Sequence, residues 1–242
     1  MISKDKNIYL FDIDGTLTEP LSKMDSSFTY SFLSWMADKK VFLVGGSDFK
    51  KISLQVPQSV ISRCSGIFSC MGNELRTKEG IKYQKEWKAP VKLLDELLEI
   101  RKSSRYENKR SKYIESRRGM INFSVAGRDS SEEERKDYFL WDQKSKERIV
   151  ISKNLKRKFP ELDICIGGMI SLDIQPRGWD KAQAVDWIKS QRQYENCKMF
   201  FFGDKCHNGG NDESLFKRVT KEGGEAYNVE GPKETLEIIS RL

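Results

Sequence analysis

The amino-acid sequence predicts an α/β fold, in which a doubly wound parallel sheet forms the core and an α+β cap with an antiparallel sheet is inserted into it. Three short apolar runs near the two ends of the chain are continuous rather than alternating. This pattern is typical of strands buried on both faces of a parallel sheet. Segments with helical spacing separate them. The middle of the chain changes to alternating strands, which favours an antiparallel sheet with one solvated or ligand-facing side.

Polar residues follow each apolar run directly. The runs are residues 8–11, 41–44 and 199–202, and they lead into Asp12, into Gly45-Gly46-Ser47 and into Gly203-Asp204. In open α/β sheets, ligands bind outside the carboxyl ends of the strands. We therefore expect separated parts of the sequence to place Asp12, Ser47 and Asp204 in one crevice of a Rossmann-like core.

Helices are expected between the apolar runs. Residues 27–38 and 180–190 carry apolar side chains at the spacing of one helix face. Strands that alternate with helices at both ends of the chain indicate a doubly wound core. We therefore assign residues 1–80 and 180–242 to this core.

The cap is expected at residues 81–179. It contains a helical pattern at residues 91–101 and several strand patterns. Residues 170–174 alternate strictly, which puts Ser171 and Asp173 on one face of a strand. We expect that face to be solvated or to contact a ligand.

The composition restricts the class of protein and its partners. Hydrophobic residues make up 38% of the 242 residues, enough for a packed core, and the formal net charge of +7 favours anionic partners such as phosphate esters, nucleic acid or anionic lipid. The five cysteines are scattered without a C-x-x-C pair, which argues against a disulfide framework and a structural zinc site. Neither an export signal nor an apolar stretch of membrane-spanning length is evident. We expect a cytoplasmic protein without a membrane partner.

Two carboxylates at the end of the first apolar run suggest phosphoryl transfer. Asp12 can attack phosphorus and hold the phosphoryl group as an aspartyl phosphate. Such an attack needs a cation, and Mg²⁺ suits oxygen ligands, for which we expect Asp12, Asp14 and Asp204. A turn at Gly15-Thr16 would bring Asp14 into the same pocket as a general acid and base. The alternative is an Asp pair that only caps a turn.

Further candidates come from the other strand ends and from a helix start. The Ser47 hydroxyl could contact a phosphoryl oxygen, although a helix N-cap is an alternative role. Lys181, at the start of the helix at 180–190, could pair with the nucleophile and the transferring group, whereas most helix lysines are only solvated. Asn211 and Asp212 are expected to order the metal ion or its waters.

Taken in this order, these pieces resemble the haloacid-dehalogenase-like (HAD) superfamily and, more closely, the eukaryotic-type phosphomannomutase family. The motifs span nearly the whole chain and are residues 12–16, 44–49, 167–173, 178–181, 201–205 and 209–212. The resemblance implies interconversion of mannose 6-phosphate and mannose 1-phosphate, with Mg²⁺ and a hexose 1,6-bisphosphate activator, as a supply for GDP-mannose synthesis. It also implies a homodimer joined through the cap.

The same resemblance assigns roles to cap residues. Arg117, Arg128 and Arg135 match arginines that hold the distal phosphate of the sugar, and Ser171 and Asp173 match groups that contact phosphate and sugar hydroxyls. Arginine is suited to bidentate phosphate recognition. Without the resemblance, these arginines would be read as surface groups, because the chain has 43 Lys and Arg residues.

Two departures from the family pattern keep alternatives open. Leu21 stands where the family has a sugar-phosphate-binding arginine, so a sugar-phosphate or sugar-bisphosphate phosphatase is the main alternative. Arg218 lies where the family has an acidic residue of an additional cation site, which we expect to be lost or replaced by the arginine charge. A basic nucleic-acid or membrane-surface binder with a degenerate fold is disfavoured, because no basic-aromatic stripe accompanies the intact carboxylates. We expect hexose phosphates as partners and no nucleic acid.

Overall fold

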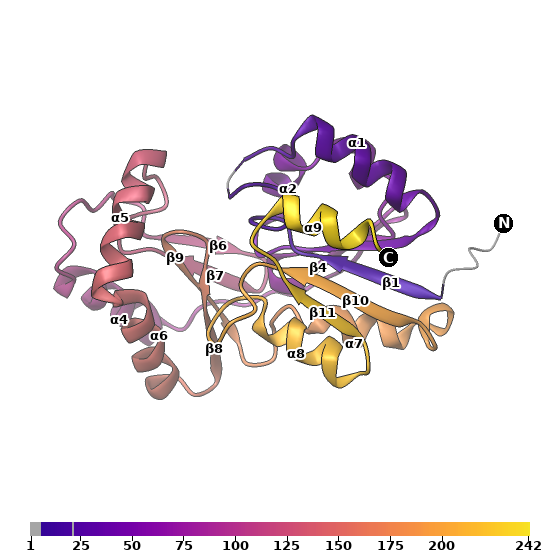
Figure 1. Ribbon diagram of the computed structural model, residues 1–242. Coiled ribbons are helices and arrows are strands. Elements are labelled where there is room, and N and C mark those ends of the chain that lie inside the picture. Colours follow the sequence, from indigo (N-terminus) through magenta and orange to yellow (C-terminus); the bar gives the residue numbers. More distant parts are fainter. Residues whose placement is uncertain (1–5, 21) are drawn as a thin grey trace.

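The computed structural model describes residues 6–20 and 22–242 and shows two lobes, each built around its own sheet (Figure 1). The larger lobe has a seven-stranded sheet in the order β11-β10-β1-β2-β3-β4-β5. Its strands are β1 (Asn7–Phe11), β2 (Lys40–Val44), β3 (Gly66–Ser69), β4 (Glu74–Thr77), β5 (Gly80–Gln84), β10 (Lys198–Gly203) and β11 (Glu225–Asn228). The pairs from β11 to β3 are parallel, and β4 and β5 add antiparallel strands at one edge.

The three predicted apolar strands are neighbours in this sheet. Strand β1 lies between β10 and β2, and Phe11 is in register with Phe202 and Leu43. Because these strands are parallel, their carboxyl ends meet at the same edge, which positions the residues that follow each strand.

Helices cover both faces of the core sheet, which confirms the doubly wound arrangement. One face packs against α1 (Ser26–Trp35), α2 (Phe49–Gln55), α3 (Gln58–Ile61) and α9 (Pro232–Ile239). The other packs against α7 (Gln183–Ser190) and α8 (Glu213–Lys221). Successive strand residues therefore enter different clusters: Phe11 is buried with α1, and Leu10 lies in the cluster that includes α7 and α8.

Helix α7 begins later than the sequence pattern predicted. The Asp180 side chain accepts a hydrogen bond from the Ala182 backbone N–H at 2.8 Å, and a turn spans residues 181–182. The helix starts at Gln183, so Lys181 belongs to the turn that precedes it. This turn directs Lys181 inward instead of along a solvated helix face.

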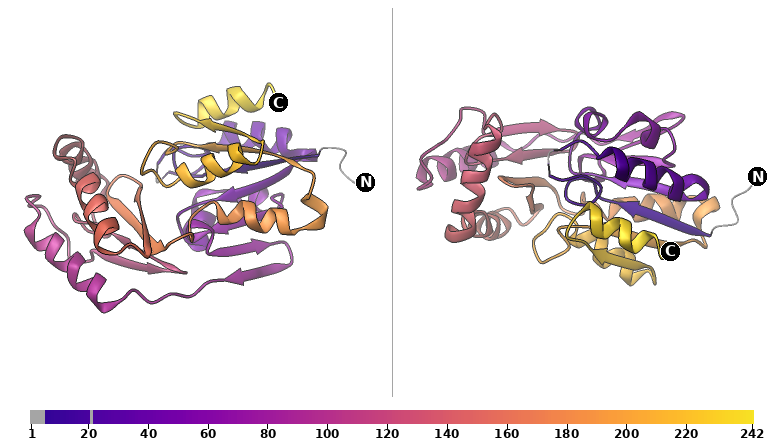
Figure 2. Two further views of the ribbon diagram at one scale, coloured as in Figure 1. Left: turned by 90° about the horizontal axis from the view of Figure 1, so that it is seen from below. Right: turned by 45° about the horizontal axis from the view of Figure 1, so that its top comes forward.

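The smaller lobe is the predicted α+β cap. Its antiparallel sheet has the order β6-β7-β9-β8, with strands β6 (Ile114–Arg117), β7 (Met120–Phe123), β8 (Leu162–Gly167) and β9 (Ser171–Pro176). Helices α4 (Val91–Ser103), α5 (Glu132–Ser145) and α6 (Glu147–Lys158) pack on its apolar face. Figure 2 shows these helices on the side of the cap that is away from the core. The polar face of the sheet is thereby left toward the core.

The core sheet extends past the boundary expected at residue 80. Strand β5 pairs with β4, so the first core segment reaches Gln84. The chain returns near Trp179, and the two crossings lie side by side, because Lys85 Nζ is 4.6 Å from the centre of the Trp179 ring. Among the described residues, every helix is too short or too polar to cross a membrane.

Candidate active site

The ends of the three predicted strands converge on one cavity of about 660 Å³ between the lobes. Asp12, Ser47 and Asp204 line its core side. The cap side is lined by Arg117, Arg128, Arg135, Ser171 and Asp173. The structure thus brings together the candidates from the strand ends and those from the cap, with Lys181 fully buried beside Asp12.

A buried ion-pair network surrounds Asp12. The Lys181 Nζ atom lies 2.5 Å from Asp12 Oδ1 and 2.7 Å from Asp212 Oδ1. All three side chains are buried. A buried ammonium is strongly destabilising unless carboxylates compensate its charge, and here two do so. Lys181 therefore holds Asp12 in a fixed orientation at the end of β1.

Burial also determines the ionisation of this network. It raises the pKa of Asp12 to about 8, with Lys181 opposing the shift and the charges of Asp212 and Asp204 adding to it. Burial disfavours the charge of Lys181, but the two carboxylates outweigh it and raise the pKa of this lysine. The arrangement therefore has excess negative charge that a further cation would offset.

The carboxylates fit a magnesium ion. Oxygens of Asp12, Asp204 and Asp212 lie within 4.8 Å of one another. Both Asp212 oxygens already accept hydrogen bonds, one from Lys181 and one from the Lys205 backbone N–H. The buried Asp204 Oδ1 has no hydrogen-bond partner among the described residues, as expected for an oxygen that awaits a ligand. Asp12 and Asp204 are therefore the residues that would hold Mg²⁺.

Asp14 lies in the same cavity, and its role as a metal ligand remains a prediction. The turn after it has Gly15 at φ +88°, and Asp14 lines the same cavity as Asp12. Its Oδ1 accepts a hydrogen bond from Gln55 Nε2 at 2.7 Å. The Asp14 carboxylate does not belong to the three-carboxylate group, whereas Asp212 does. From the sequence, Asp212 was expected to order the metal ion or its waters. It is buried because its loop folds back, with the Asp212 N–H donating to the Lys205 carbonyl.

Gly15 also allows the close approach of Asp204. A Cβ atom at this position would lie 2.4 Å from Asp204 Oδ2, and the positive φ is unfavourable for residues with side chains. The Asp-Gly pair thus forms the turn and leaves space for a carboxylate from another strand.

Ser47 lies on the cavity wall and is not the N-cap of the following helix. The N-cap of α2 is Asp48, whose side chain accepts from the Lys51 N–H at 2.8 Å. The suggested capping role for Ser47 is therefore wrong, and Ser47 lines the cavity after two glycines.

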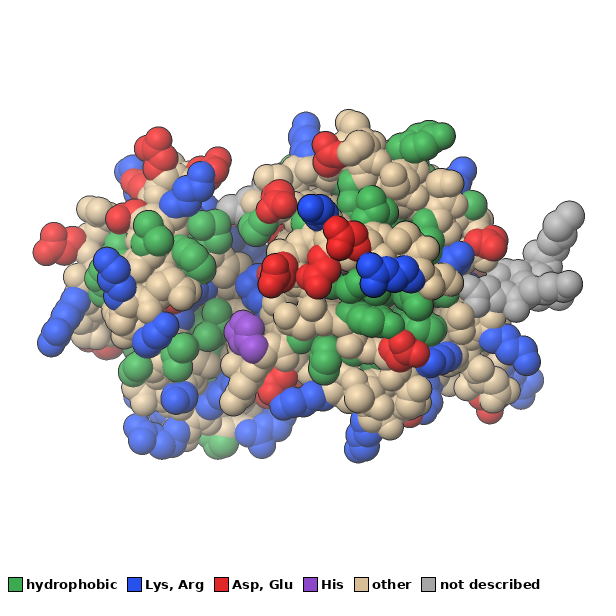
Figure 3. Space-filling model, viewed as in Figure 1, with side chains coloured by type: hydrophobic (Ala, Val, Ile, Leu, Met, Phe, Trp, Pro, Cys, Tyr) green, Lys and Arg blue, Asp and Glu red, His purple; other side chains and the backbone are tan. Residues whose placement is uncertain are grey.

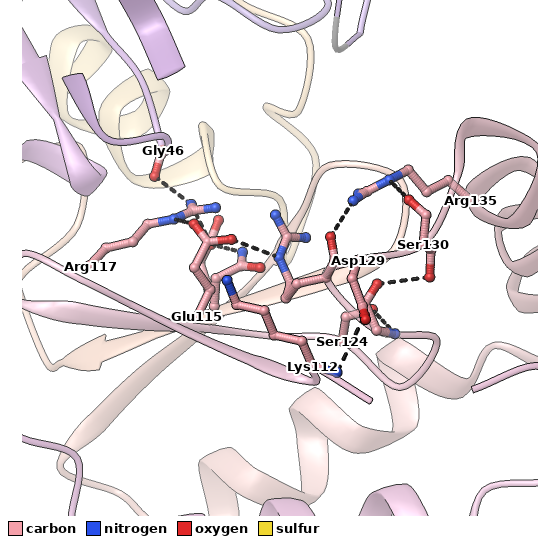
Figure 4. Close-up of polar contacts among 12 residues, drawn as sticks. Gly46, Lys112, Glu115, Arg117, Ser124, Asp129, Ser130 and Arg135 are labelled. Atoms are coloured by element: carbon pink, nitrogen blue, oxygen red, sulfur yellow. Dashed lines mark hydrogen bonds and ion pairs between the residues drawn. The ribbon is translucent and has the colours of Figure 1, made fainter. Parts of the chain in front are cut away.

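Two of the three cap arginines have buried side chains and the third, Arg135, is half-buried, so their reading as surface groups is wrong. Arg117 and Arg128 have side chains that are 5% and 9% exposed, and both contact Glu115. Arg117 Nη1 also donates to the Gly46 carbonyl of the core at 2.9 Å (Figure 4). Arg135 donates to the carbonyls of Ser130 and Arg128. The cap therefore presents fixed guanidinium groups to the cavity.

Strand β9 supplies the other predicted cap residues. Ser171 and Asp173 are buried on the polar face of the sheet, as the alternation predicted. Asp173 Oδ1 accepts from Asn122 Nδ2 at 2.6 Å. The turn before Ser171 is held by buried Arg148, which donates to the carbonyls of Gly167 and Gly168.

The core and cap also meet through the loop that follows Asp204. The Ile166 backbone N–H on strand β8 donates to the Gly209 carbonyl at 2.8 Å, and Ile166 forms an isolated bridge with Gly210. Strand β8 is an edge strand of the cap sheet, so its outward N–H is available for this contact.

Some site residues were missed from the sequence. Lys51 lines the cavity one helical turn after Ser47, and burial lowers its pKa. Glu115 contacts two arginines, but no sequence pattern distinguishes it from other charged residues in the strands. The change at Leu21 lies outside the described residues. Arg218, the other departure, pairs with Asp186 and Glu222 on the core surface.

Comparisons with known proteins identify the family of the chain. The sequence model described as eukaryotic phosphomannomutase matches residues 31–242. A phosphomannomutase of Spinacia oleracea is 32% identical over 100% of this chain and 98% of that protein. One of Saccharomyces cerevisiae is 33% identical over 99% of this chain and 95% of that protein.

Solved structures share the fold at low sequence identity. A HAD subclass IIB sugar phosphatase has a TM-score of 0.59 at 15% identity, over 97% of this chain and 98% of that one. A Synechocystis sucrose-phosphatase, solved with sucrose and phosphate, has a TM-score of 0.57 at 14% identity, over 98% of this chain and 88% of that one. These similarities establish the two-lobed architecture.

Proposed function

The chain belongs to the eukaryotic phosphomannomutase family, and we propose that it interconverts mannose 6-phosphate and mannose 1-phosphate through an aspartyl phosphate on Asp12. One observation carries this proposal: Asp12 and two arginines with buried side chains, Arg117 and Arg128, line the core and cap sides of one cavity. A hexose with phosphate at both ends could therefore place one phosphate on each side.

The core side would perform the chemistry. Asp12 attacks phosphorus, and Lys181 keeps its carboxylate oriented. Mg²⁺, when bound by Asp12 and Asp204, supplies positive charge between carboxylate and phosphate. Asp14, oriented by Gln55, donates a proton to the leaving oxygen and later removes one from the acceptor hydroxyl. The Ser47 hydroxyl would contact the transferring group.

The cap side would recognise the distal phosphate. The bisphosphate intermediate must turn over so that either phosphate can reach Asp12, and Arg117, Arg128 and Arg135 then hold whichever phosphate is distal. Ser171 and Asp173 would contact phosphate and sugar hydroxyls. A closed cap excludes water and favours the sugar as acceptor.

Further parts of the proposal concern the surroundings of the reaction. A hexose 1,6-bisphosphate would first phosphorylate Asp12 and thereby act as activator. The product mannose 1-phosphate would feed GDP-mannose synthesis. We propose that the protein works in the cytoplasm as a homodimer joined through the cap, with hexose phosphates as partners and neither nucleic acid nor membrane.

Simultaneous measurement of two products tests the proposal. Mannose 1-phosphate is supplied with Mg²⁺ and a hexose 1,6-bisphosphate, and the formation of mannose 6-phosphate and of inorganic phosphate are followed together. Isomerisation should exceed phosphate release. Phosphate release without isomerisation would instead identify a sugar-phosphate phosphatase, the alternative that Leu21 suggests.

A further inference from the structure

Glu115 connects two cap arginines whose side chains are almost fully buried, Arg117 and Arg128. It lies on β6 opposite Asn122 of β7, on the polar face of the sheet. Its Oε1 accepts from Arg117 Nε at 2.7 Å and its Oε2 accepts from Arg128 Nε at 3.2 Å. One carboxylate thus uses each of its oxygens for a different guanidinium (Figure 4).

These contacts leave the outer ends of both guanidiniums for other partners. Each arginine donates its Nε–H to Glu115, and within the described residues no hydrogen bond occupies Nη2 of Arg117 or the two terminal nitrogens of Arg128. Arg117 Nη1 already reaches the core at the Gly46 carbonyl, beside Ser47. Both arginines line the cavity, whereas Glu115 is not among the described residues that line it. The Glu115 carboxylate therefore contacts the two guanidinium groups from the side that faces away from the cavity.

The two neighbouring positive charges of Arg117 and Arg128 require a compensating negative charge. Burial lowers the pKa of Arg128, and the neighbouring charge of Arg117 adds to this effect. Burial also disfavours the charge of Glu115, but the two guanidiniums outweigh it and lower its pKa to about 2. Two buried cations this close would separate without an anion between them. Asp173 Oδ1 also lies 3.9 Å from Arg117 Nη1, but among the described residues Glu115 is the carboxylate that contacts both guanidiniums and keeps them adjacent.

We propose that Glu115 is a positioning residue, which aims Arg117 and Arg128 at the distal phosphate of the sugar. This inference rests on the proposed function, in which the arginines take a phosphate from either end of the hexose. Planar forks recognise phosphate well only when their directions are fixed. Glu115 would therefore favour a phosphate at one set distance from Asp12 over anions in general.

The test compares two ligands and two carboxylates. Glu115→Gln keeps the shape but leaves only one acceptor oxygen and no charge. The control Glu86→Gln removes a cap carboxylate that pairs with exposed Arg118 at 3.0 Å. Calorimetry measures the binding of mannose 6-phosphate and of inorganic sulfate to both variants. For Glu115→Gln we expect about tenfold weaker binding of mannose 6-phosphate, corresponding to the loss of one charge-assisted contact.

Sulfate binding separates positioning from other roles. A free anion can adapt to re-aimed arginines, and the extra positive charge attracts it, so its affinity should stay equal or rise. Tighter binding of both ligands would show that Glu115 only competes with anions. Weaker binding of both, with a lower Tm, would show a structural role. Wild-type affinities for both ligands would also overturn the proposal.

Two further measurements keep the test decisive. Where Glu115→Gln does not fold, Glu115→Asp replaces it, because the shorter side chain keeps the charge but cannot reach both guanidiniums; a smaller change with the same selectivity is expected. Where turnover is present, KM should rise more than kcat falls. Because binding is measured without turnover, an absent isomerase activity would contradict the proposed function and leave the positioning inference to the calorimetry.

Discussion

The core and the cap build their sides of the cavity by different means. Core residues such as Asp12 stand directly after buried parallel strands, so the backbone of the sheet fixes them. Cap residues such as Arg117 reach the cavity on long side chains, which need acceptors such as Glu115 to hold them. Precise attack thus relies on the sheet, and recognition relies on supported side chains.

The two lobes also differ in charge. Residues 1–84 and 180–242, which build the core lobe, contain 21 Lys and Arg and 20 Asp and Glu, so segment 85–179 carries +6 of the formal net charge of +7. Figure 3 shows Lys and Arg side chains spread over the lower part of the cap. Because a positive lobe attracts anions, changes in the cap should act mainly on KM and changes in the core mainly on kcat.

The largest effect is expected from the core nucleophile. Asp12→Asn should lower kcat by about 10⁴-fold or more, since no other carboxylate can take its place in line with the substrate. Binding of mannose 6-phosphate, measured by calorimetry, should persist because the cap is unchanged. Asp38→Asn, on the exposed surface, is the control. Surviving turnover of Asp12→Asn would remove Asp12 as nucleophile.

Lys181→Met should affect both stability and rate. It leaves Asp12 and Asp212 buried without their cation, which should lower the free energy of unfolding by about 3–5 kcal/mol. The kcat should fall by about 10²–10³-fold as the carboxylate loses its orientation. Urea unfolding and steady-state kinetics measure both. The same change at exposed Lys189 should cost about 0–1 kcal/mol; equal losses would refute the special role of Lys181.

A neighbouring pair of arginines tests the cap. Arg117→Lys keeps the charge but removes the fork, so KM for mannose 1-phosphate should rise by about 10–100-fold with a smaller change in kcat. Arg118→Lys changes the next residue, which is exposed, and should leave KM unaltered. A fall in kcat alone would contradict the division of labour between the lobes.

The contact between the lobes can be broken at one atom. Ile166→Pro removes the outward N–H of an edge strand, where proline is tolerated, whereas Ile166→Ala shortens the side chain and keeps the N–H. The ratio of phosphate release to isomerisation should rise by about 3–10-fold in the proline variant only, which matches the loss of one hydrogen bond. Equal ratios in both variants would contradict a role for this bond.

The smallest effect concerns pH. The pKa of Asp12 is about 8 in the folded protein without a cation, against an ordinary value of 3.8. Between these pH values the Asp12 carboxyl binds more protons in the folded state than in the unfolded state. The contribution of Asp12 to the free energy of unfolding is therefore fully present below about pH 4 and is lost as pH rises through 8. Because Mg²⁺ binds the carboxylate form, it should raise Tm more at pH 8 than at pH 6. Asp12→Asn should show a smaller difference, which burial of Asp204 still sustains by raising the pKa of that carboxyl.

The core half of the site could be predicted because strand ends are visible in the sequence. Continuous apolar runs locate Asp12, Ser47 and Asp204, and parallel pairing brings them together. Asp14 followed from the turn at Gly15. These inferences need only local pattern and the geometry of a parallel sheet.

The remaining features depend on contacts between distant parts of the chain. Asp212 enters the carboxylate group only because its loop folds back onto Lys205. Glu115 looks like an ordinary solvated strand residue until two arginines meet on it. Strand β5 is mostly exposed and carries no apolar run, so the pattern could not show that it extends the core sheet.

The bond from Ile166 to Gly209 has a thermodynamic consequence. It joins the cap to the same loop that carries Asp204 and Asp212. The position of the cap and the arrangement of these carboxylates are therefore energetically coupled. This coupling is reciprocal: if closure of the cap raises the affinity for a cation, binding of the cation favours the closed cap by the same factor. Cation binding at the carboxylates would thereby favour closure of the cap at the other end of the loop.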